Sequence, residues 1–319
     1  METQKKAFVT GITGFVGKYL AEYLTSQGWR VFGLDRWSTC HYPDITYFEG
    51  DILDTATFRE MLSSIQPQCI FHLAAISFLP DADFSPRHAL DINVMGSASI
   101  LDAARQACPS CKILLIGSSK QYGDMVVSDS ITEEQPCNPT NFYGVSKYMA
   151  ELVGLQYVRQ YGLDVRFTRS FNHTGPGQSP HFVCSDWAKQ VVAITLKKSA
   201  PCIHVGDLSP TIDFTDVRDV VRAYAAILDN GKKGEAYNVC SNKGTALETI
   251  LSYLTNKCTT PIAIEQDESR IRANKTSIKI TGDHSKLTRD TGWTPAIPIE
   301  KTLDDIFQYW VTHLPTASA

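Results

Sequence analysis

The sequence predicts an α/β protein with a doubly wound parallel sheet and a smaller α/β lobe toward the C-terminus. In the first half of the 319 residues, short apolar runs alternate with longer helical stretches. Continuous apolar strands separated by helices are typical of a parallel sheet that is covered on both faces. A glycine-rich turn follows the first apolar run, and near residue 170 the alternation gives way to frequent turns, which indicates a second structural unit.

Taken in chain order, the expected strands are short runs rich in apolar and β-branched residues. They are Lys6–Thr10, Arg30–Leu34, a segment shortly before Asp51, Cys69–Leu73, Lys112–Ile116 and Val165–Thr168. The expected helices are Phe15–Ser26, Thr55–Ile65, Ala89–Ala107, Tyr143–Tyr161 and, in the second half, Phe182–Lys198. This order assigns residues 1–170 to a nucleotide-binding lobe, with a returning segment near 213–240, and residues 171–319 to most of the second lobe. Ligands of such sheets bind at the carboxyl ends of the strands.

Composition and charge argue against several classes of protein. Hydrophobic residues make up 43% of the chain and charged residues 20%, which is ordinary for a globular protein. The net charge of −4 argues against a broad surface for nucleic acid or for an anionic membrane. No apolar run approaches the ~18 residues of a membrane span, and the first residues do not read as a signal peptide. The nine scattered cysteines are expected to be reduced thiols, so the expected location is cytoplasmic. Cys108 and Cys111 have zinc or redox spacing, but no second pair completes a site, and no metal is expected.

A glycine loop between the first strand and the first helix indicates a dinucleotide site. Its spacing is Gly-x-x-Gly-x-x-Gly, and the helix that follows would offer free N–H groups to a pyrophosphate. Asp35, at the end of the second strand, would accept hydrogen bonds from the adenosine ribose and slightly favours NAD. Arg36 could instead hold the 2′-phosphate of NADP, so the choice stays open. Asp51 is either an adenine contact or a helix cap. The candidate cofactor-binding residues here are Gly11, Thr13, Gly14, Phe15, Val16, Gly17, Asp35, Arg36, Asp51 and Ile52.

Three polar residues form the candidate catalytic set. Tyr143 and Lys147 are four residues apart, hence on one face of a helix. The spacing alone is weak evidence, because Tyr253 and Lys257 share it. What distinguishes the first pair is Ser118, at the end of a strand that opens into the expected cleft. A cation ~4 Å from the phenol, at an effective dielectric of ~20, contributes about 4 kcal/mol. We therefore expect Lys147 to lower the pKa of Tyr143 from about 10 toward neutrality.

These motifs, in this order, resemble the extended short-chain dehydrogenase/reductase family that acts on nucleotide sugars. The resemblance is carried by Thr10–Gly17, Leu73-Ala74-Ala75, Ser118-Ser119 before Tyr122-Gly123, Tyr143–Lys147, Arg169–Gln178, Asp213–Asp219, Tyr237–Ser241 and Thr291–Pro295. It implies a Rossmann-type fold with an NAD(P)-binding domain and a nucleotide-sugar substrate-binding lobe. It also implies a homodimer, Ser118, Tyr143 and Lys147 as catalytic residues, and cofactor contacts from Leu73, Ala74, Ala75, Tyr143 and Lys147.

The runs Phe171–Gln178 and Tyr237–Ser241 look most like those of GDP-4-keto-6-deoxy-mannose reductases. The resemblance therefore implies reduction of a nucleotide-linked 4-keto-6-deoxy hexose, from GDP-4-keto-6-deoxy-D-mannose to GDP-D-rhamnose. A 4-epimerase or 4,6-dehydratase of the same family is the first alternative. The second is a non-catalytic dinucleotide-sensing protein, which is disfavoured because the chain keeps both Tyr143 and Lys147.

Two positions depart from the family pattern. Lys120 stands where the dehydratases carry a Glu that removes a proton from the sugar, which disfavours dehydration. Lys120 could still act as an acid–base, or it could be solvated or face a phosphate. Ile212 stands where the family usually has an Arg that grips the diphosphate. The candidate substrate-binding residues are therefore Ser119, Lys120, Asn172, Lys189, Arg218 and Arg272.

Overall fold

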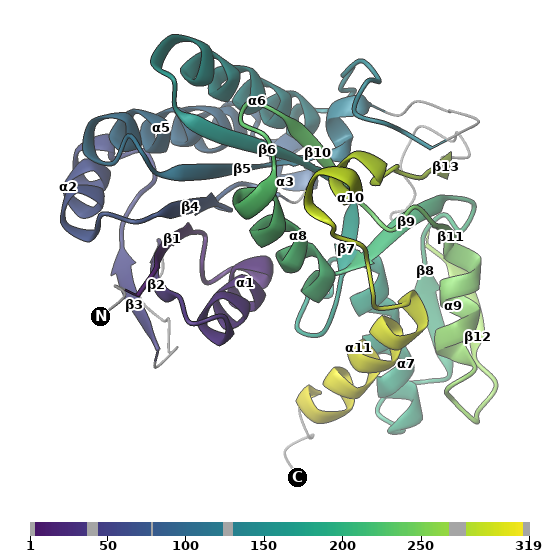
Figure 1. Cartoon of the computed structure of the whole chain (residues 1–319). Helices are drawn as coiled ribbons and strands as arrows, with labels where there is room; N and C mark the ends of the chain where they lie inside the picture. Colours follow the sequence, from purple (N-terminus) through teal and green to yellow (C-terminus); the bar gives the residue numbers. More distant parts are fainter. Residues whose placement is uncertain (1–3, 37–43, 78, 124–129, 268–278, 315–319) are drawn as a thin grey trace.

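A seven-stranded parallel sheet forms the centre of the protein (Figure 1). The computed structural model describes residues 4–36, 44–77, 79–123, 130–267 and 279–314. The strand order is β10-β6-β5-β4-β1-β2-β3, so the direction of winding reverses between β1 and β4. The strands are β1 Lys6–Thr10, β2 Arg30–Asp35, β3 Ile45–Glu49, β4 Cys69–His72, β5 Lys112–Ser118, β6 Asp164–Ser170 and β10 Ala236–Val239. The doubly wound fold that the sequence predicts is confirmed.

Helices cover both faces of this sheet. On one face lie α1 (Phe15–Ser26) and α8 (Val217–Asn230), whose apolar residues share a core with β1 and β10. The helix α10 (Ser285–Thr291) adds Leu287 to the same core, although it comes late in the chain. On the other face lie α2 (Thr55–Ile65), α5 (Gly96–Ala107) and α6 (Phe142–Tyr161). Segments from the last third of the chain thus complete the packing of the large sheet.

The helical stretch expected near Ala89–Ala107 is present, but one wider turn interrupts its α-helical geometry. The short helix α4 (Pro86–Leu90) leads into a π-helical turn, η1 (Asp91–Met95), and only then does α5 begin. The Asn93 side chain explains the interruption. It bonds both the N–H and the carbonyl of Ile76, at 2.8 and 3.1 Å, and donates to the Ser146 hydroxyl at 2.8 Å. Hydrophobic periodicity cannot reveal one extra residue in a turn.

The second lobe packs three helices around its own apolar core. These helices are α7 (Val183–Thr195), α9 (Leu247–Thr255) and α11 (Ile299–His313). The helix α7 is shorter than the expected Phe182–Lys198, because Phe182 has extended backbone and Lys197 has a φ of +56°. Beside the helices, β9 (Thr211–Asp216) pairs with β7 (Asn172–Thr174), β11 (Gly244–Ala246) and β13 (Lys279–Ile280).

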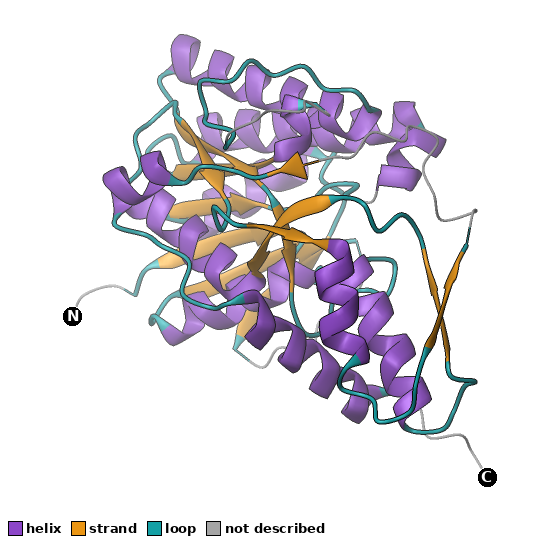
Figure 2. Cartoon of the chain, turned by 90° about the vertical axis from the view of Figure 1, so that its right-hand side faces the viewer, coloured by secondary structure: helices purple, strands orange, loops and turns teal. Residues whose placement is uncertain are grey.

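A separate two-stranded parallel sheet, β8 (Cys202–Val205) with β12 (Ala263–Gln266), lies at the side of the second lobe (Figure 2). The remaining helices are α3 (Leu79–Phe84) and the 3₁₀ turn η2 (Ser119–Tyr122). Across the described part of the chain, no helix combines the length and apolar character that a membrane span requires.

Candidate active site

The glycine loop brings the backbone of β1 against the residues that follow β4. Gly11 has a φ of +71°, and a Cβ there would lie 2.7 Å from the Ala74 nitrogen. A Cβ at Gly17 would lie 2.4 Å from the Gly11 oxygen, so close packing of helix on strand requires glycine. Gly14 is the N-cap of α1, where no described side chain caps the helix and the first turn holds no acidic residue. This helix end, which is uncapped and has no acidic residue in its first turn, fits a pyrophosphate.

Asp35 and Arg36 lie beside this loop. One Asp35 carboxylate oxygen accepts from the Thr13 N–H at 3.1 Å and from its hydroxyl at 2.6 Å, which ties the loop to β2. The Arg36 guanidinium pairs with Asp51 at 3.0 Å, and both side chains are about half exposed (48% and 42%). Such a surface pair is weak, so it leaves Arg36 accessible to a ligand.

The structure separates the two roles considered for Asp51. Its carboxylate accepts from the Leu53 N–H at 3.0 Å, and this bond, followed by Arg36, lowers its pKa. The cap of α2 is Asp54 instead, which accepts from the Thr57 N–H at 3.1 Å. The helix-cap interpretation of Asp51 is therefore wrong. The side chain of Ile52 is buried in the core, and its assignment as a cofactor contact stays a prediction.

Leu73, Ala74 and Ala75 continue from the end of β4 into the switch point of the sheet. The Leu73 N–H donates to the Thr10 carbonyl at 3.2 Å, and the Ala74 N–H lies 3.3 Å from the Thr10 hydroxyl oxygen. The same hydroxyl bonds Nδ1 of His72 at 2.8 Å. The other ring nitrogen of His72 has no partner among the described residues, and burial lowers its pKa to about 3. His72 is thus a neutral ring below the dinucleotide loop.

Ser118, Tyr143 and Lys147 meet at the carboxyl end of β5. Ser118 is the last residue of that strand, and Asn141 caps α6 by accepting from the Gly144 N–H at 2.8 Å. This cap places Tyr143 in the first turn, where its phenol lies near enough to the Ser118 side chain for that group to act on its pKa. One turn later, the buried Lys147 ammonium donates to the Ile116 carbonyl at 2.9 Å. The structure therefore brings together the three residues that the sequence singles out.

The expected effect of Lys147 on Tyr143 is wrong. Burial raises the pKa of Tyr143, and only the Ser118 side chain opposes this. Burial also lowers the pKa of Lys147 to about 8, and its ammonium is held at the Ile116 carbonyl. The sequence argument counted the charge of the lysine but underestimated desolvation, which penalises both the phenolate and the ammonium. Tyr143 is consequently a neutral phenol, suited to donate a proton.

Sequence reasoning missed a buried ion-pair network behind Ser118. The Gln121 side chain accepts from the Ser118 N–H at 2.8 Å and donates to Glu151 at 2.6 Å. The Arg169 guanidinium donates to both Glu151 oxygens, at 2.6 and 3.1 Å. Because Glu151 follows Lys147 by one helical turn, it lies on the same stripe of α6. A glutamate four residues after Lys147, on the same helix face, is the feature of the sequence that could have indicated this buried ion pair.

The candidate substrate residues divide into two groups. Ser119 and Lys120 lie in η2, directly after Ser118, and Ser119 is buried. Asn172 is exposed and begins β7 just beyond Ser170, which is the register partner of Ser118. These residues therefore lie at the carboxyl edge of the sheet, the same edge at which Tyr143 lies beside Ser118.

The remaining candidates are placed differently. The Arg218 guanidinium is bound by Asp216 at 2.6 Å and by Asp305 at 2.9 Å. Since two carboxylates already neutralise it, Arg218 is not a free anion ligand. The Lys189 ammonium lies 5.2 Å from the centroid of the Trp310 ring. Arg272 lies outside the described residues, and Ile212 is part of β9.

Comparison with known proteins agrees with this geometry. Residues 8–306 match the family described as GDP-mannose 4,6 dehydratase. The GDP-6-deoxy-D-mannose reductase of Pseudomonas aeruginosa is 33% identical over 307 residues, covering 96% of this chain and 97% of that protein. The GDP-mannose 4,6-dehydratase of Yersinia enterocolitica is 25% identical over 343 residues, covering 93% of this chain and 91% of that protein.

Solved structures show the same relationship. RMD from Pseudomonas aeruginosa, solved in complex with NADPH, is 31% identical with a TM-score of 0.83, covering 97% of this chain and 99% of that one. A putative epimerase from Burkholderia cenocepacia is 29% identical with a TM-score of 0.86, covering 98% of this chain and 100% of that one. The glycine loop, the Ser118–Tyr143–Lys147 group and these similarities lead to one conclusion: this chain belongs to the GDP-mannose 4,6-dehydratase family.

Proposed function

We propose that this protein is an NAD(P)H-dependent reductase of the 4-keto group in a nucleotide-linked 4-keto-6-deoxy hexose. The proposed substrate is GDP-4-keto-6-deoxy-D-mannose and the product is GDP-D-rhamnose. The observation that carries the proposal is the neutral Tyr143 phenol beside Ser118 at the carboxyl end of β5. Its similarity to the GDP-6-deoxy-D-mannose reductase of Pseudomonas aeruginosa supports the choice of substrate.

The proposed roles follow from the placement of each side chain. With its pyrophosphate held at the glycine loop, the dinucleotide would supply a hydride to the keto carbon from its reduced nicotinamide. Ser118 donates a hydrogen bond to the keto oxygen, and Tyr143 gives its proton to the alkoxide that forms there. Lys147, with a pKa of about 8, is largely an ammonium at neutral pH, and it would hold the nicotinamide ribose one helical turn from Tyr143. Arg169 and Glu151 hold Ser118 in place through Gln121.

The cofactor is proposed to be held by the uncapped end of α1 and by the residues that follow β2 and β4. Asp35 would bind the adenosine ribose, whereas the half-exposed Arg36 would bind a 2′-phosphate. The two residues therefore support either NADH or NADPH as the reductant. Measuring KM for both reduced cofactors decides between them.

Lys120 distinguishes reduction from dehydration. Dehydratases that this sequence resembles carry a Glu at this position, and an ammonium is a poor substitute for a carboxylate base. A dehydratase or an epimerase returns its cofactor to the starting redox state, whereas a reductase consumes it. Product analysis by NMR, together with the absorbance of the reduced nicotinamide, separates these reactions.

The decisive experiment follows the oxidation of NADPH and NADH with enzymatically prepared GDP-4-keto-6-deoxy-D-mannose. The wild-type protein should consume reduced cofactor and form a 4-hydroxy product. Tyr143→Phe should abolish this turnover, whereas Tyr148→Phe, on the same helix, is the matched control and should retain it. Absence of turnover by the wild type, or equal turnover by Tyr143→Phe, would contradict the proposal.

We also propose that the protein is a cytoplasmic homodimer. Its support is an apolar surface on η1 and α6, where Met95, Phe142, Met149 and Leu152 are each 41–55% exposed. Two copies of this surface would bury these side chains against each other. Light scattering after size exclusion should report a dimer, and Leu152→Asp should yield monomers. The cytoplasmic location is supported by the eight described cysteines, which are all free thiols, and cell fractionation tests it.

A further inference from the structure

A cysteine, a histidine and a glutamate converge on the surface of the β8–β12 sheet, on elements that carry none of the proposed catalytic residues. Cys202 and His204 alternate along β8, so both point to one face of the sheet. Ile203 and Val205 point to the other face and are fully buried in the core of the second lobe. The burial of these two apolar residues therefore fixes the outward direction of the thiol and the imidazole.

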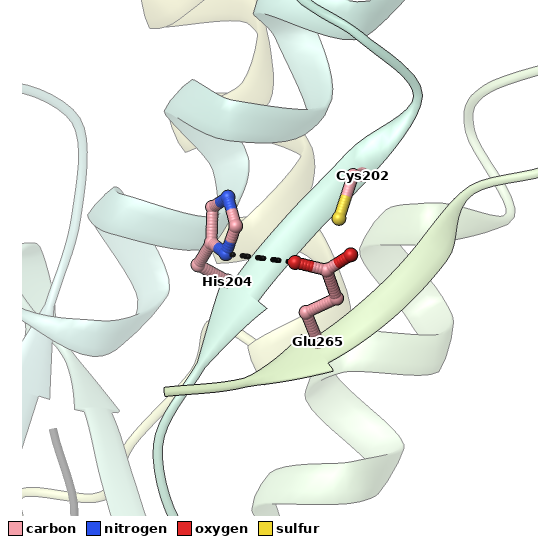
Figure 3. Close-up of side chains that lie close together, drawn as sticks. All are labelled: Cys202, His204 and Glu265. Atoms are coloured by element: carbon pink, nitrogen blue, oxygen red, sulfur yellow. Dashed lines mark ion pairs between the residues drawn. The ribbon is translucent and has the colours of Figure 1, made fainter. Parts of the chain in front are cut away.

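The partner strand supplies the third group. In the parallel register of β12, Glu265 is paired with His204. Figure 3 shows the Cys202 sulfur and the His204 ring beside the Glu265 carboxylate, with 3.6 Å between Nδ1 of His204 and Oε2 of Glu265. One donor atom from each of the three residues lies within 4.8 Å of the other two.

These distances are close to those of a tetrahedral zinc site. With zinc bonds of about 2.0–2.1 Å to nitrogen or oxygen and about 2.3 Å to sulfur, neighbouring ligand atoms lie about 3.4–3.6 Å apart. The His204–Glu265 pair already has this separation, and a small rotation of the partly buried Cys202 thiol would complete the triangle. Thiolate, imidazole and carboxylate together are a donor set that suits zinc, and three protein ligands leave one position for water.

The backbone around His204 is held firmly. The Gln190 side chain accepts from the His204 N–H at 2.9 Å and donates to its carbonyl at 3.1 Å. Gln190 in turn donates to Asp186 at 3.0 Å, so α7 clamps the free edge of β8. In contrast, among the described strands β12 pairs with β8 alone, and all four of its residues are exposed. A two-stranded sheet is marginally stable alone, so a cross-strand metal bond would act where the structure is weakest.

We propose that Cys202, His204 and Glu265 form a zinc site with an open fourth position, which ties β12 to β8. The expectation from the sequence that no metal binds considered only the Cys108/Cys111 pair. The new site joins a Cys-x-His pair to a carboxylate that only the strand register brings near. Without a metal, burial and the Glu265 carboxylate raise the pKa of the Cys202 thiol. Zinc would reverse this by replacing the thiol proton, which it releases to solvent.

Cobalt(II) titration of untagged, full-length protein, treated first with a chelator, tests the proposal. The wild type should develop a thiolate-to-cobalt charge-transfer band that saturates at one equivalent and is displaced by zinc. Cys202→Ala should abolish the band, and Glu265→Gln should weaken cobalt binding more than about 100-fold, since even residues that only support metal ligands contribute 10–100-fold. Cys258→Ala, which removes another partly buried thiol of the second lobe, is the matched control and should behave as the wild type.

A second readout measures the consequence for stability. Zinc should raise the melting temperature of the wild type and of Cys258→Ala, but not that of Cys202→Ala. Turnover should be the same in all three proteins. The proposal is overturned if the wild type shows no charge-transfer band, if Cys202→Ala keeps it, or if Cys258→Ala loses it. Because neither readout depends on substrate, failure here is independent of the proposed reductase activity.

Discussion

Replacing Arg169 by Met should destabilise the protein strongly, because it would leave the Glu151 carboxylate buried without its cation. The two side chains are only 5% and 11% exposed, and the guanidinium contacts both carboxylate oxygens at 2.6 and 3.1 Å. Arg169 also donates to the Tyr122 hydroxyl and to the Glu133 carbonyl, each at 3.2 Å. Removing one partner from such a buried pair costs about 3–5 kcal/mol.

The free energy of unfolding, measured in urea at pH 7, checks this magnitude. Arg169→Met should lower it by about 4 kcal/mol. The double variant Glu151→Gln/Arg169→Met should recover part of that loss, because it removes the buried charge and keeps an amide beside Gln121. The matched control is Arg105→Met, which breaks a 2.7 Å pair with Asp102 at the surface. Both of those side chains are about one third exposed, so the loss should stay below about 1 kcal/mol.

The reasoning would be refuted if Arg169→Met cost no more than Arg105→Met, or if the double variant were less stable than Arg169→Met alone. The pair also has a consequence for catalysis, because Gln121 links Glu151 to the Ser118 backbone. Glu151→Gln should therefore lower kcat more than it changes KM. An unchanged kcat would show that Ser118 keeps its position without the carboxylate.

Three further predictions concern the cofactor site and its lysine. The pKa of Lys147 is about 8 in the folded protein, below that of the unfolded chain, so between pH 8 and pH 10 the unfolded state binds more protons. The free energy of unfolding should therefore rise with pH over this range, by up to about 3 kcal/mol. Lys147→Met should lack this contribution. If the free energy of unfolding in urea depended on pH equally in the variant and in the wild type, the prediction would be contradicted. Gly17→Ala should weaken dinucleotide binding at least tenfold in a fluorescence titration, because the new Cβ would lie 2.4 Å from the Gly11 oxygen. An unchanged affinity would count against a phosphate site at this loop. Arg36→Ala should raise KM for NADPH about tenfold, the strength of one charge-assisted hydrogen bond, with little change for NADH; equal changes in both would show that Arg36 does not contact the 2′-phosphate.

Local patterns were sufficient to predict six of the seven strands of the sheet and their order along the chain, whereas β10 was covered only by the expected returning segment near 213–240. Most strands of the sheet are short, continuously apolar runs, and the glycine loop lies in the short turn between the first strand and the first helix. The Tyr143–Lys147 spacing is equally local, since residues four apart share a helix face. The π turn at Asp91–Met95 was missed because an inserted residue leaves the apolar pattern of the neighbouring turns unchanged.

The sequence by itself determined which side chains reach the carboxyl edge of the sheet, because alternation, glycine spacing and helix periodicity depend only on neighbours along the chain. Only the tertiary structure decided their protonation and their partners. The pKa of Tyr143 depends on how completely the surrounding packing removes water, and that packing includes α8, which lies far along the chain. The Glu151–Arg169 pair and the Cys202–His204–Glu265 cluster likewise depend on strand register and helix packing, which no local pattern encodes.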